Sequence, residues 1–125
     1  LAVAKYLEQN DKVTYVNYCG LENDKYHALA EKYLPNGSCG VVSFGVKGGR
    51  KAAEEFMKHL KLGSIETHVA DARTCCLHPA SATHRQMNDE ELTACGVYPD
   101  LVRYSCGLED AEDLIADLEQ AFAQI

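Results

Sequence analysis

Arg103 is the residue of this sequence whose surroundings most need a chemical explanation. It lies in LVRYSC (residues 101–106), whose β-branched and aromatic residues predict a strand. Because side chains alternate along a strand, Leu101, Arg103 and Ser105 share one face. A guanidinium there is costly to bury without an anion, and the strand contains no acidic residue. The residues alone leave three explanations open: a salt bridge to a distant carboxylate, an edge strand that lets Arg103 reach water, or capture of a ligand carboxylate.

The cysteines form a second group that could carry chemistry: Cys19, Cys39, Cys75, Cys76, Cys95 and Cys106. They include one adjacent pair and lack the CxxC spacing that zinc sites prefer. Most lie among apolar residues, where cysteine behaves as a small hydrophobe. We therefore interpret them as core residues and predict no metal site. A redox or metal role for Cys75 and Cys76 is the alternative hypothesis, and it requires a thiol with a lowered pKa.

The glycine-rich segment GVKGGR (residues 45–50) follows an expected strand and precedes an expected helix, a position that can bind phosphate. It lacks the GK[ST] ending of a P-loop and the spacing GxGxxG. We therefore predict that Gly48 and Gly49 form a tight turn with positive φ. Lys47 and Arg50 are then expected to be solvated.

His78 and His84 flank the polar loop HPASATH (residues 78–84). They do not have helical i, i+4 spacing, and no third ligand lies nearby in the sequence. Hydrogen bonds that fix the loop are the favoured interpretation. Ser81 and Ser105 belong to no nucleophile elbow or ordered triad. The sequence patterns therefore give no indication of nucleophilic catalysis by these serines.

Apolar periodicity predicts the elements that must position these residues. Strands are expected at residues 13–18, 40–46, 64–70, 74–77 and 101–106, and helices at 1–9, 24–34, 49–60, 88–96 and 109–122. This order predicts an α/β (α+β) domain with a small mixed, largely antiparallel sheet and helices mainly on one face.

Side-chain patterns predict how three of these helices begin and what they bury. Asp24 is expected to cap the second helix, and Asn88 with Glu91 resembles a capping box. The first turn of the last helix is expected to gather acidic residues, which favours the helix dipole: Glu109, Asp110, Glu112 and Asp113. The second helix is expected to bury a stripe of helical spacing: Tyr26, Leu29, Ala30, Tyr33 and Leu34.

Length and composition restrict the class of protein. The chain has 125 residues, 12 Lys and Arg against 19 Asp and Glu, and 46% apolar residues. That length fits one domain able to fold without disulfides or a metal. A net charge of −7 with no basic stripe argues against nucleic acid and anionic membranes as partners. With no apolar run long enough to span a bilayer, we expect a soluble, cytoplasmic protein.

Longer motifs resemble a known family. THVADARTCCLHPASATHRQM (67–87) and GVYPDLVRYSCGLEDAEDLIADLEQA (96–121) resemble the C-terminal domain of the cystathionine γ-synthase family, the pyridoxal-phosphate (PLP) enzymes of cysteine and methionine metabolism. GLENDKYHALAEKYLPNGSCGVVSFGVKGG (20–49) is similar to the same family, and its LPNG and KGG details most resemble the O-acetylhomoserine sulfhydrylase branch.

The resemblance implies roles for individual residues. Arg103 matches the arginine that binds the substrate α-carboxylate, which favours the third explanation of its position. His68 and Val69 lie in the stretch that borders cofactor and substrate. Relatives carry Ser or Asn at the position of His68, and many carry proline at that of Cys19.

The resemblance also implies how the whole enzyme is organised. Residues 1–10 are expected to end a helix that leads from a larger domain, and residues 11–125 to form the C-terminal small domain. The cofactor is PLP, whose Schiff-base lysine lies outside these residues, so the fragment is expected to be inactive alone. The implied enzyme is a homotetramer that joins O-acetylhomoserine to sulfide or methanethiol. Alternatives are methionine γ-lyase, cystathionine γ-synthase, or a stand-alone module that binds a carboxylate.

Overall fold

A computed structural model describes all 125 residues of the chain and shows five helices and five strands. The helices are α1 (Ala2–Gln9), α2 (His27–Tyr33), α3 (Gly49–Lys58), α4 (Asp89–Ala94) and α5 (Ala111–Phe122). The strands are β1 (Val13–Asn17), β2 (Val41–Val46), β3 (Ser64–Ile65), β4 (Cys75–Leu77) and β5 (Leu101–Ser105).

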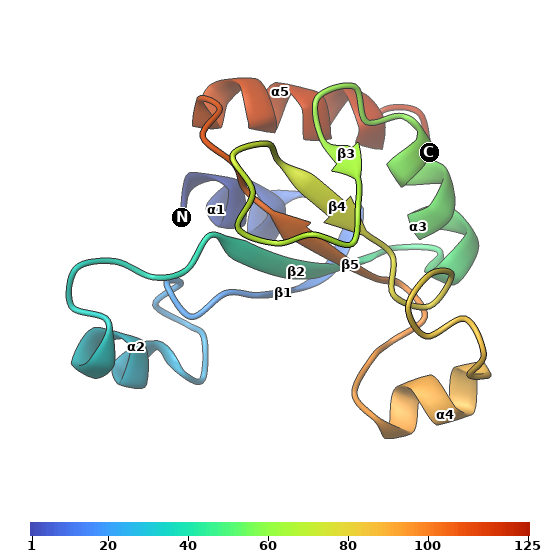
Figure 1. Cartoon of the computed structure of the whole chain (residues 1–125), viewed down its shortest axis with the longest axis horizontal. Helices are drawn as coiled ribbons and strands as arrows, with labels where there is room; N and C mark the ends of the chain where they lie inside the picture. The colour runs from blue at the N-terminus through green and yellow to red at the C-terminus, as the bar shows by residue number, and fades with distance from the viewer.

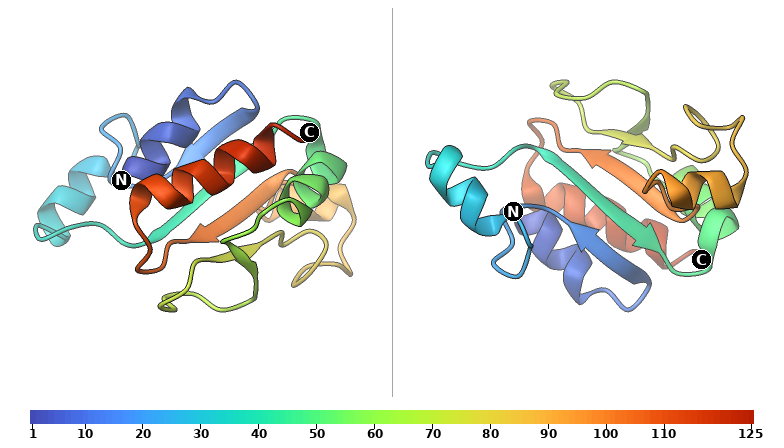
Figure 2. Two further views of the ribbon diagram at one scale, coloured as in Figure 1. Left: turned by 90° about the horizontal axis from the view of Figure 1, so that it is seen from above. Right: turned by 90° about the horizontal axis from the view of Figure 1, so that it is seen from below.

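The strands form one sheet in the order β1-β2-β5-β4-β3. All neighbouring strands are antiparallel except β3 and β4, which are parallel. Helices α1, α3 and α5 lie against one face, and the opposite face of β1, β2 and β5 has no helix packed over it (Figures 1 and 2). The predicted mixed, largely antiparallel sheet with helices mainly on one face is therefore confirmed.

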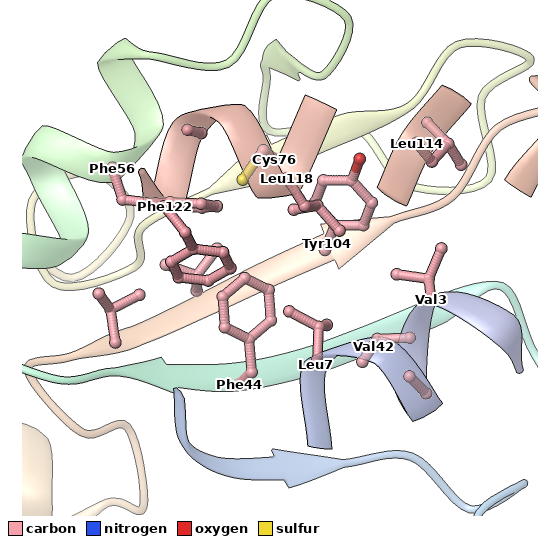
Figure 3. Close-up of a cluster of buried hydrophobic side chains, with 14 of the residues drawn as sticks. Val3, Leu7, Val42, Phe44, Phe56, Cys76, Tyr104, Leu114, Leu118 and Phe122 are labelled. Atoms are coloured by element: carbon pink, nitrogen blue, oxygen red, sulfur yellow. The ribbon is translucent and has the colours of Figure 1, made fainter. Parts of the chain in front are cut away.

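The hydrophobic core lies between the sheet and these three helices (Figure 3). Phe44 of β2, Phe56 of α3 and Phe122 of α5 are almost fully buried. The rings of Phe56 and Phe122 stack with centroids 4.3 Å apart, and Phe44 meets Phe56 edge to face at 5.9 Å. These contacts between distant parts of the chain hold α3 and α5 against the middle of the sheet.

Two predicted local features are confirmed. Gly48 and Gly49 have φ of 107° and 76°, the left-handed conformation that the tight turn before α3 requires. The capping box of α4 has both of its hydrogen bonds, from the Glu91 backbone N–H to the Asn88 side chain and from the Asn88 N–H to the Glu91 carboxylate, each 2.9 Å long. These predictions depended only on neighbouring residues.

The segment expected to be a helix at residues 24–34 differs from its prediction. The regular helix α2 is shorter, since it begins at His27 and ends at Tyr33. Asp24 lies before the helix, and its carboxylate accepts hydrogen bonds from the backbone N–H groups of Tyr18 and Tyr26. Of the predicted buried stripe, only Ala30 is buried, whereas Tyr26, Leu29, Tyr33 and Leu34 are exposed. The helix projects beyond the end of the sheet, so no layer of the fold covers its apolar side (Figure 1).

Two further expectations about elements are wrong. The strand expected at residues 64–70 ends at Ile65, and an extended strand could not have continued through Ala70, which has a φ of 57°. Glu109 precedes α5 rather than lying in its first turn, and its carboxylate accepts hydrogen bonds from the backbone N–H and the hydroxyl of Thr74. Those bonds join the start of β4 to the turn after β5.

Candidate functional site

Arg103 lies at the centre of the sheet face that carries no helix. Its cross-strand neighbours are Ser43 on β2 and Leu77 on β4, and Ser43 in turn pairs with Asn17 on β1. Residues directly opposite each other in antiparallel strands point to the same face. One row across four strands is therefore formed by Asn17, Ser43, Arg103 and Leu77. Three of these four residues are polar.

The guanidinium of Arg103 is held by the backbone of the segment 66–73, which joins β3 to β4. Its Nη2 atom donates to the carbonyl oxygens of Thr67, at 2.8 Å, and His68, at 3.1 Å. The next polar contact of this segment is a hydrogen bond of 3.1 Å from the N–H of Ala70 to the hydroxyl of buried Ser105. The segment thus lies over the end of β5 and fixes the plane of the guanidinium.

No carboxylate of the chain pairs with Arg103. Every ion pair involves other residues, and the Nε atom of Arg103 is buried without a hydrogen-bond partner. β5 is a central strand between β2 and β4, so the edge-strand explanation also fails. A cation with unused donors, oriented by carbonyl oxygens, has the chemistry to bind an anion.

His68 and Val69 lie beside Arg103 but differ in how they face it. The main chain of His68 contacts Arg103, whereas its side chain is exposed and lies 3.7 Å from the carboxylate of Glu66. Val69 is about half exposed. The structure therefore brings the backbone of His68, rather than its imidazole, to the guanidinium.

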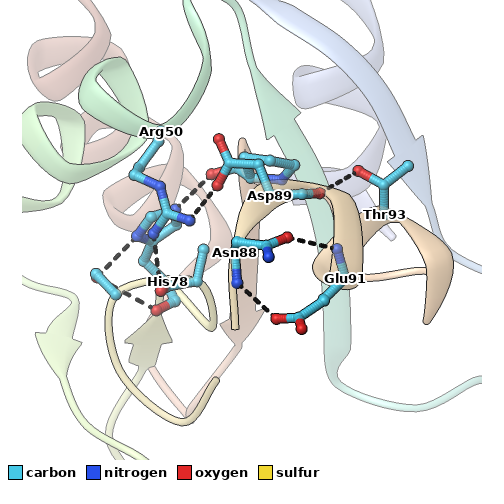
Figure 4. A network of polar contacts seen from close by, with 9 residues as sticks. Arg50, His78, Asn88, Asp89, Glu91 and Thr93 are labelled. Carbon is cyan, nitrogen blue, oxygen red and sulfur yellow. Dashed lines mark hydrogen bonds and ion pairs between the residues drawn. The ribbon is translucent and has the colours of Figure 1, made fainter. Parts of the chain in front are cut away.

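The loop HPASATH is fixed by hydrogen bonds, as predicted for its histidines (Figure 4). The buried ring of His78 lies 2.8 Å from the Ser81 hydroxyl and donates its Nε2–H to the carbonyl oxygen of Pro99 at 2.7 Å. The imidazole of His84 contacts only its neighbour Thr83, and the backbone N–H of His84 donates to the carbonyl oxygen of Pro79 at 2.9 Å. His78 thereby ties the end of β4 to the residues that lead into β5.

Arg50 was expected to be solvated but instead has partners within the protein, whereas Lys47 is exposed as expected. Arg50 donates to the carbonyl oxygen of Ala80 at 2.8 Å and forms an ion pair with Asp89 at the start of α4 (Figure 4). Arg50 therefore joins three segments of the chain. Nothing within the sequence of the glycine turn indicated these distant partners.

The cysteine pair lacks the properties that a redox or metal role requires. All six cysteines are free, and Cys75 and Cys76 are buried in β4. Burial raises the pKa of both thiols above the ordinary value, which disfavours the reactive thiolate. No group of three His, Cys, Asp or Glu side chains has a geometry that would hold a metal ion.

A PLP site requires a lysine amine for the Schiff base in addition to the groups that bind the substrate. The row around Arg103 offers an unpaired cation but contains no lysine amine. These residues alone therefore do not hold the cofactor.

None of the five helices has the length and apolar character needed to cross a bilayer.

The chain resembles known proteins in both fold and sequence. Over 97% of this chain, the fold matches a crystal structure described as a putative O-acetylhomoserine (thiol)-lyase from Campylobacter jejuni that contains a pyridoxyl-lysine-phosphate, with a TM-score of 0.88 and 36% identity. The chain thus has the fold of a domain of PLP enzymes. The family model for Cys/Met metabolism PLP-dependent enzymes matches residues 1–123, and the chain belongs to that family.

Curated relatives agree with that assignment. The chain is 48% identical over 120 residues to a homocysteine synthase of Schizosaccharomyces pombe. It is 45% identical over 123 residues to O-acetyl-L-homoserine sulfhydrylase 1 of Thermus thermophilus. These matches cover 96% and 98% of this chain, but only 28% and 29% of the relatives. The chain therefore spans less than a third of the length of these relatives.

Proposed function

We propose that this chain is the C-terminal substrate-binding domain of a PLP-dependent O-acetylhomoserine sulfhydrylase. Residues 11–125 would form the small domain, and residues 1–10 the end of a helix that leads from the larger one. The names of the relatives support the activity. The observation that carries the proposal is Arg103, a central-strand guanidinium oriented by the carbonyl oxygens of Thr67 and His68 and paired with no carboxylate.

Arg103 binds the α-carboxylate of O-acetylhomoserine in this proposal. Two carbonyl oxygens already hold Nη2, so little freedom of the guanidinium is lost when the carboxylate binds. The ion pair fixes one end of the substrate and thereby orients its reacting carbons. Val69 supplies an apolar wall, and the main chain of His68 keeps the arginine in place.

The rest of the enzyme supplies the chemistry that this domain lacks. PLP, when bound, acts as an electron sink that stabilises negative charge on the substrate carbons. The lysine that carries PLP lies outside these 125 residues in this proposal, and the isolated chain has no activity. Sulfide or methanethiol replaces acetate to give homocysteine or methionine. The full-length enzyme is a cytoplasmic homotetramer.

The function is tested by Arg103→Ala in the full-length enzyme that contains this domain. Loss of a charged hydrogen-bonded pair costs about 1.5–3 kcal/mol, so we expect KM for O-acetylhomoserine to rise roughly 10- to 150-fold. We expect kcat to fall as well, because the substrate is less well oriented. Steady-state kinetics with sulfide as the second substrate measures both constants. Arg103→Lys keeps the charge without the planar fork and should give an intermediate KM.

Arg85→Ala is the matched control, because Arg85 is an exposed arginine of the same domain that lies outside the row around Arg103. Its kinetics should equal those of the unmodified enzyme. Unchanged KM in Arg103→Ala would contradict the assignment of Arg103. A full-length protein that showed no visible absorption from PLP would contradict the enzyme class and favour the stand-alone carboxylate-binding module.

A further inference from the structure

The helix α2 and the two residues that flank it carry the largest group of exposed large apolar side chains in the molecule. Tyr26, Leu29, Tyr33 and Leu34 are 54%, 52%, 67% and 47% exposed, and we call them the α2 surface. Tyr26, Leu29 and Tyr33 have the spacing i, i+3, i+7, which places them along one side of the helix. Apolar side chains gathered in this way mark a surface that contacts other protein.

The α2 surface is presented in a fixed conformation. The carboxylate of Asp24 accepts hydrogen bonds from the N–H groups of Tyr18 and Tyr26, and His27 Nδ1 lies 3.0 Å from the carbonyl oxygen of Cys19. These contacts anchor the start of the helix to the end of β1. Binding to this surface would therefore cost less conformational entropy, because the start of the helix is already ordered in the free domain.

The α2 surface continues into a groove that reaches the first residue of the chain. Leu1, Tyr18, His27, Ala30, Leu34 and Ser38 line this groove. Leu1 is itself 55% exposed, and it lies beside the groove at the start of α1. In the full-length enzyme, polypeptide that precedes Leu1 must therefore leave the domain at one end of this apolar surface.

The α2 surface is smaller than a complete interface, and Leu1 at the groove points to the preceding chain as the part that would complete it. Four large side chains at about half exposure offer on the order of 400 Å² of apolar surface. A stable interface buries about 800 Å² on each partner, so the α2 surface would form only part of a larger contact. The curated relatives are more than three times as long as the matched segment, and that additional chain provides ample surface.

We propose that the α2 surface packs against the polypeptide that precedes Leu1 within the same subunit of the full-length enzyme. Contact on both sides of Leu1 fixes how this domain is placed against the rest of the chain, and with it the position of Arg103. The inference rests on the proposed function only in that it takes these residues as one part of a longer enzyme.

The proposal is tested by photo-crosslinking in the full-length enzyme. The photoreactive amino acid p-benzoylphenylalanine is introduced as Tyr33→p-benzoylphenylalanine, and a second variant carries it at Tyr26 in case the first folds poorly. Lys58 is the control position, since its side chain is 65% exposed on α3, away from α2. After irradiation, mass spectrometry identifies the crosslinked peptides, and gel mobility separates monomers from linked subunits.

We expect positions 33 and 26 to crosslink to peptides that precede Leu1, in products with the mass of one subunit. The yield of these products should be at least ten times the yield from position 58. Crosslinks at the mass of two subunits would overturn the proposal in favour of contact between copies. Crosslinks confined to these 125 residues, or no more than at position 58, would overturn it as well. Sulfhydrylase activity of the same samples is measured separately, so failure of the docking proposal is distinguishable from failure of the proposed function.

Discussion

The two faces of the sheet are built from the same strands but are completed in different ways. The face that carries Phe44, Val102 and Tyr104 is covered by three helices of the chain, and these side chains are fully buried. The face that carries Ser43 and Arg103 is covered only in part, by the segment 66–73. The first face is completed within these 125 residues, whereas the second leaves the half-buried guanidinium of Arg103 without an anionic partner.

If the open face binds substrate as proposed, this difference separates stability from function within single strands. In β2, Phe44 points into the core and Ser43 lies in the row with Arg103. In β5, Tyr104 is buried beside Arg103, which faces the other way. Because the side chains alternate, substitutions at neighbouring positions should have different consequences. One should change the stability of the fold, and the other should change substrate binding.

The largest effect should come from Phe44→Ala. It removes a fully buried ring that contacts Phe56 and Phe122, and such cavities cost about 3–5 kcal/mol of unfolding free energy. Ser43→Ala, on the other face, should change that free energy by less than about 0.5 kcal/mol. Urea denaturation followed by circular dichroism measures both. Similar losses in the two variants would show that the open face is as tightly packed as the core.

Local patterns predicted the fold well wherever one element was sufficient. The turn at Gly48 and Gly49, the capping box at Asn88 and the apolar side of α5 all depend on residues within a few positions of each other. The exposed side of α2 could not be predicted in this way. Helical spacing identifies an apolar stripe but carries no information about which part of the molecule covers it.

The candidate site was only partly visible in the sequence. Alternation placed Arg103 and Ser105 on one face, but the register that brings Ser43 and Asn17 into that row is a property of strand pairing. The carbonyl oxygens that hold Arg103 come from residues 35 and 36 positions earlier in the chain. Asp117 is a further example, since it caps the backbone N–H groups of Lys61, Leu62 and Gly63 from α5.

A smaller effect, of opposite sign, is expected at Ala70 over the open face. Its φ of 57° costs an L-residue about 1–2 kcal/mol, which glycine avoids. Glycine also adds freedom to the unfolded chain, so Ala70→Gly should stabilise by a net of roughly 0.5–1 kcal/mol. Ala72→Gly is the control, because Ala72 has no positive φ and should lose about 0.5 kcal/mol. Denaturant unfolding measures both, and a destabilised Ala70→Gly would mean that the bend in this segment is not strained.

The smallest effect concerns pH and the turn that joins β5 to α5. Burial opposes ionisation of Glu109, but hydrogen bonds from the N–H and hydroxyl of Thr74 outweigh it and lower the pKa of this carboxyl below its ordinary value. Because its pKa is lower in the folded state than in the unfolded state, Glu109 stabilises the fold above the ordinary pKa of about 4.3, and this stabilisation is lost as the pH falls through the lowered value. Glu109→Gln should therefore be less stable than the unmodified chain at pH 7, and should lose less further stability on acidification. Glu90→Gln, at an exposed position of α4, should retain the acid dependence of the unmodified chain. Urea unfolding at a series of pH values between 7 and 3 measures how the unfolding free energy of each of the three proteins depends on pH. Parallel curves for Glu109→Gln and the unmodified chain would show that the hydrogen bonds to Thr74 do not lower the pKa of Glu109 in the folded state relative to the unfolded state.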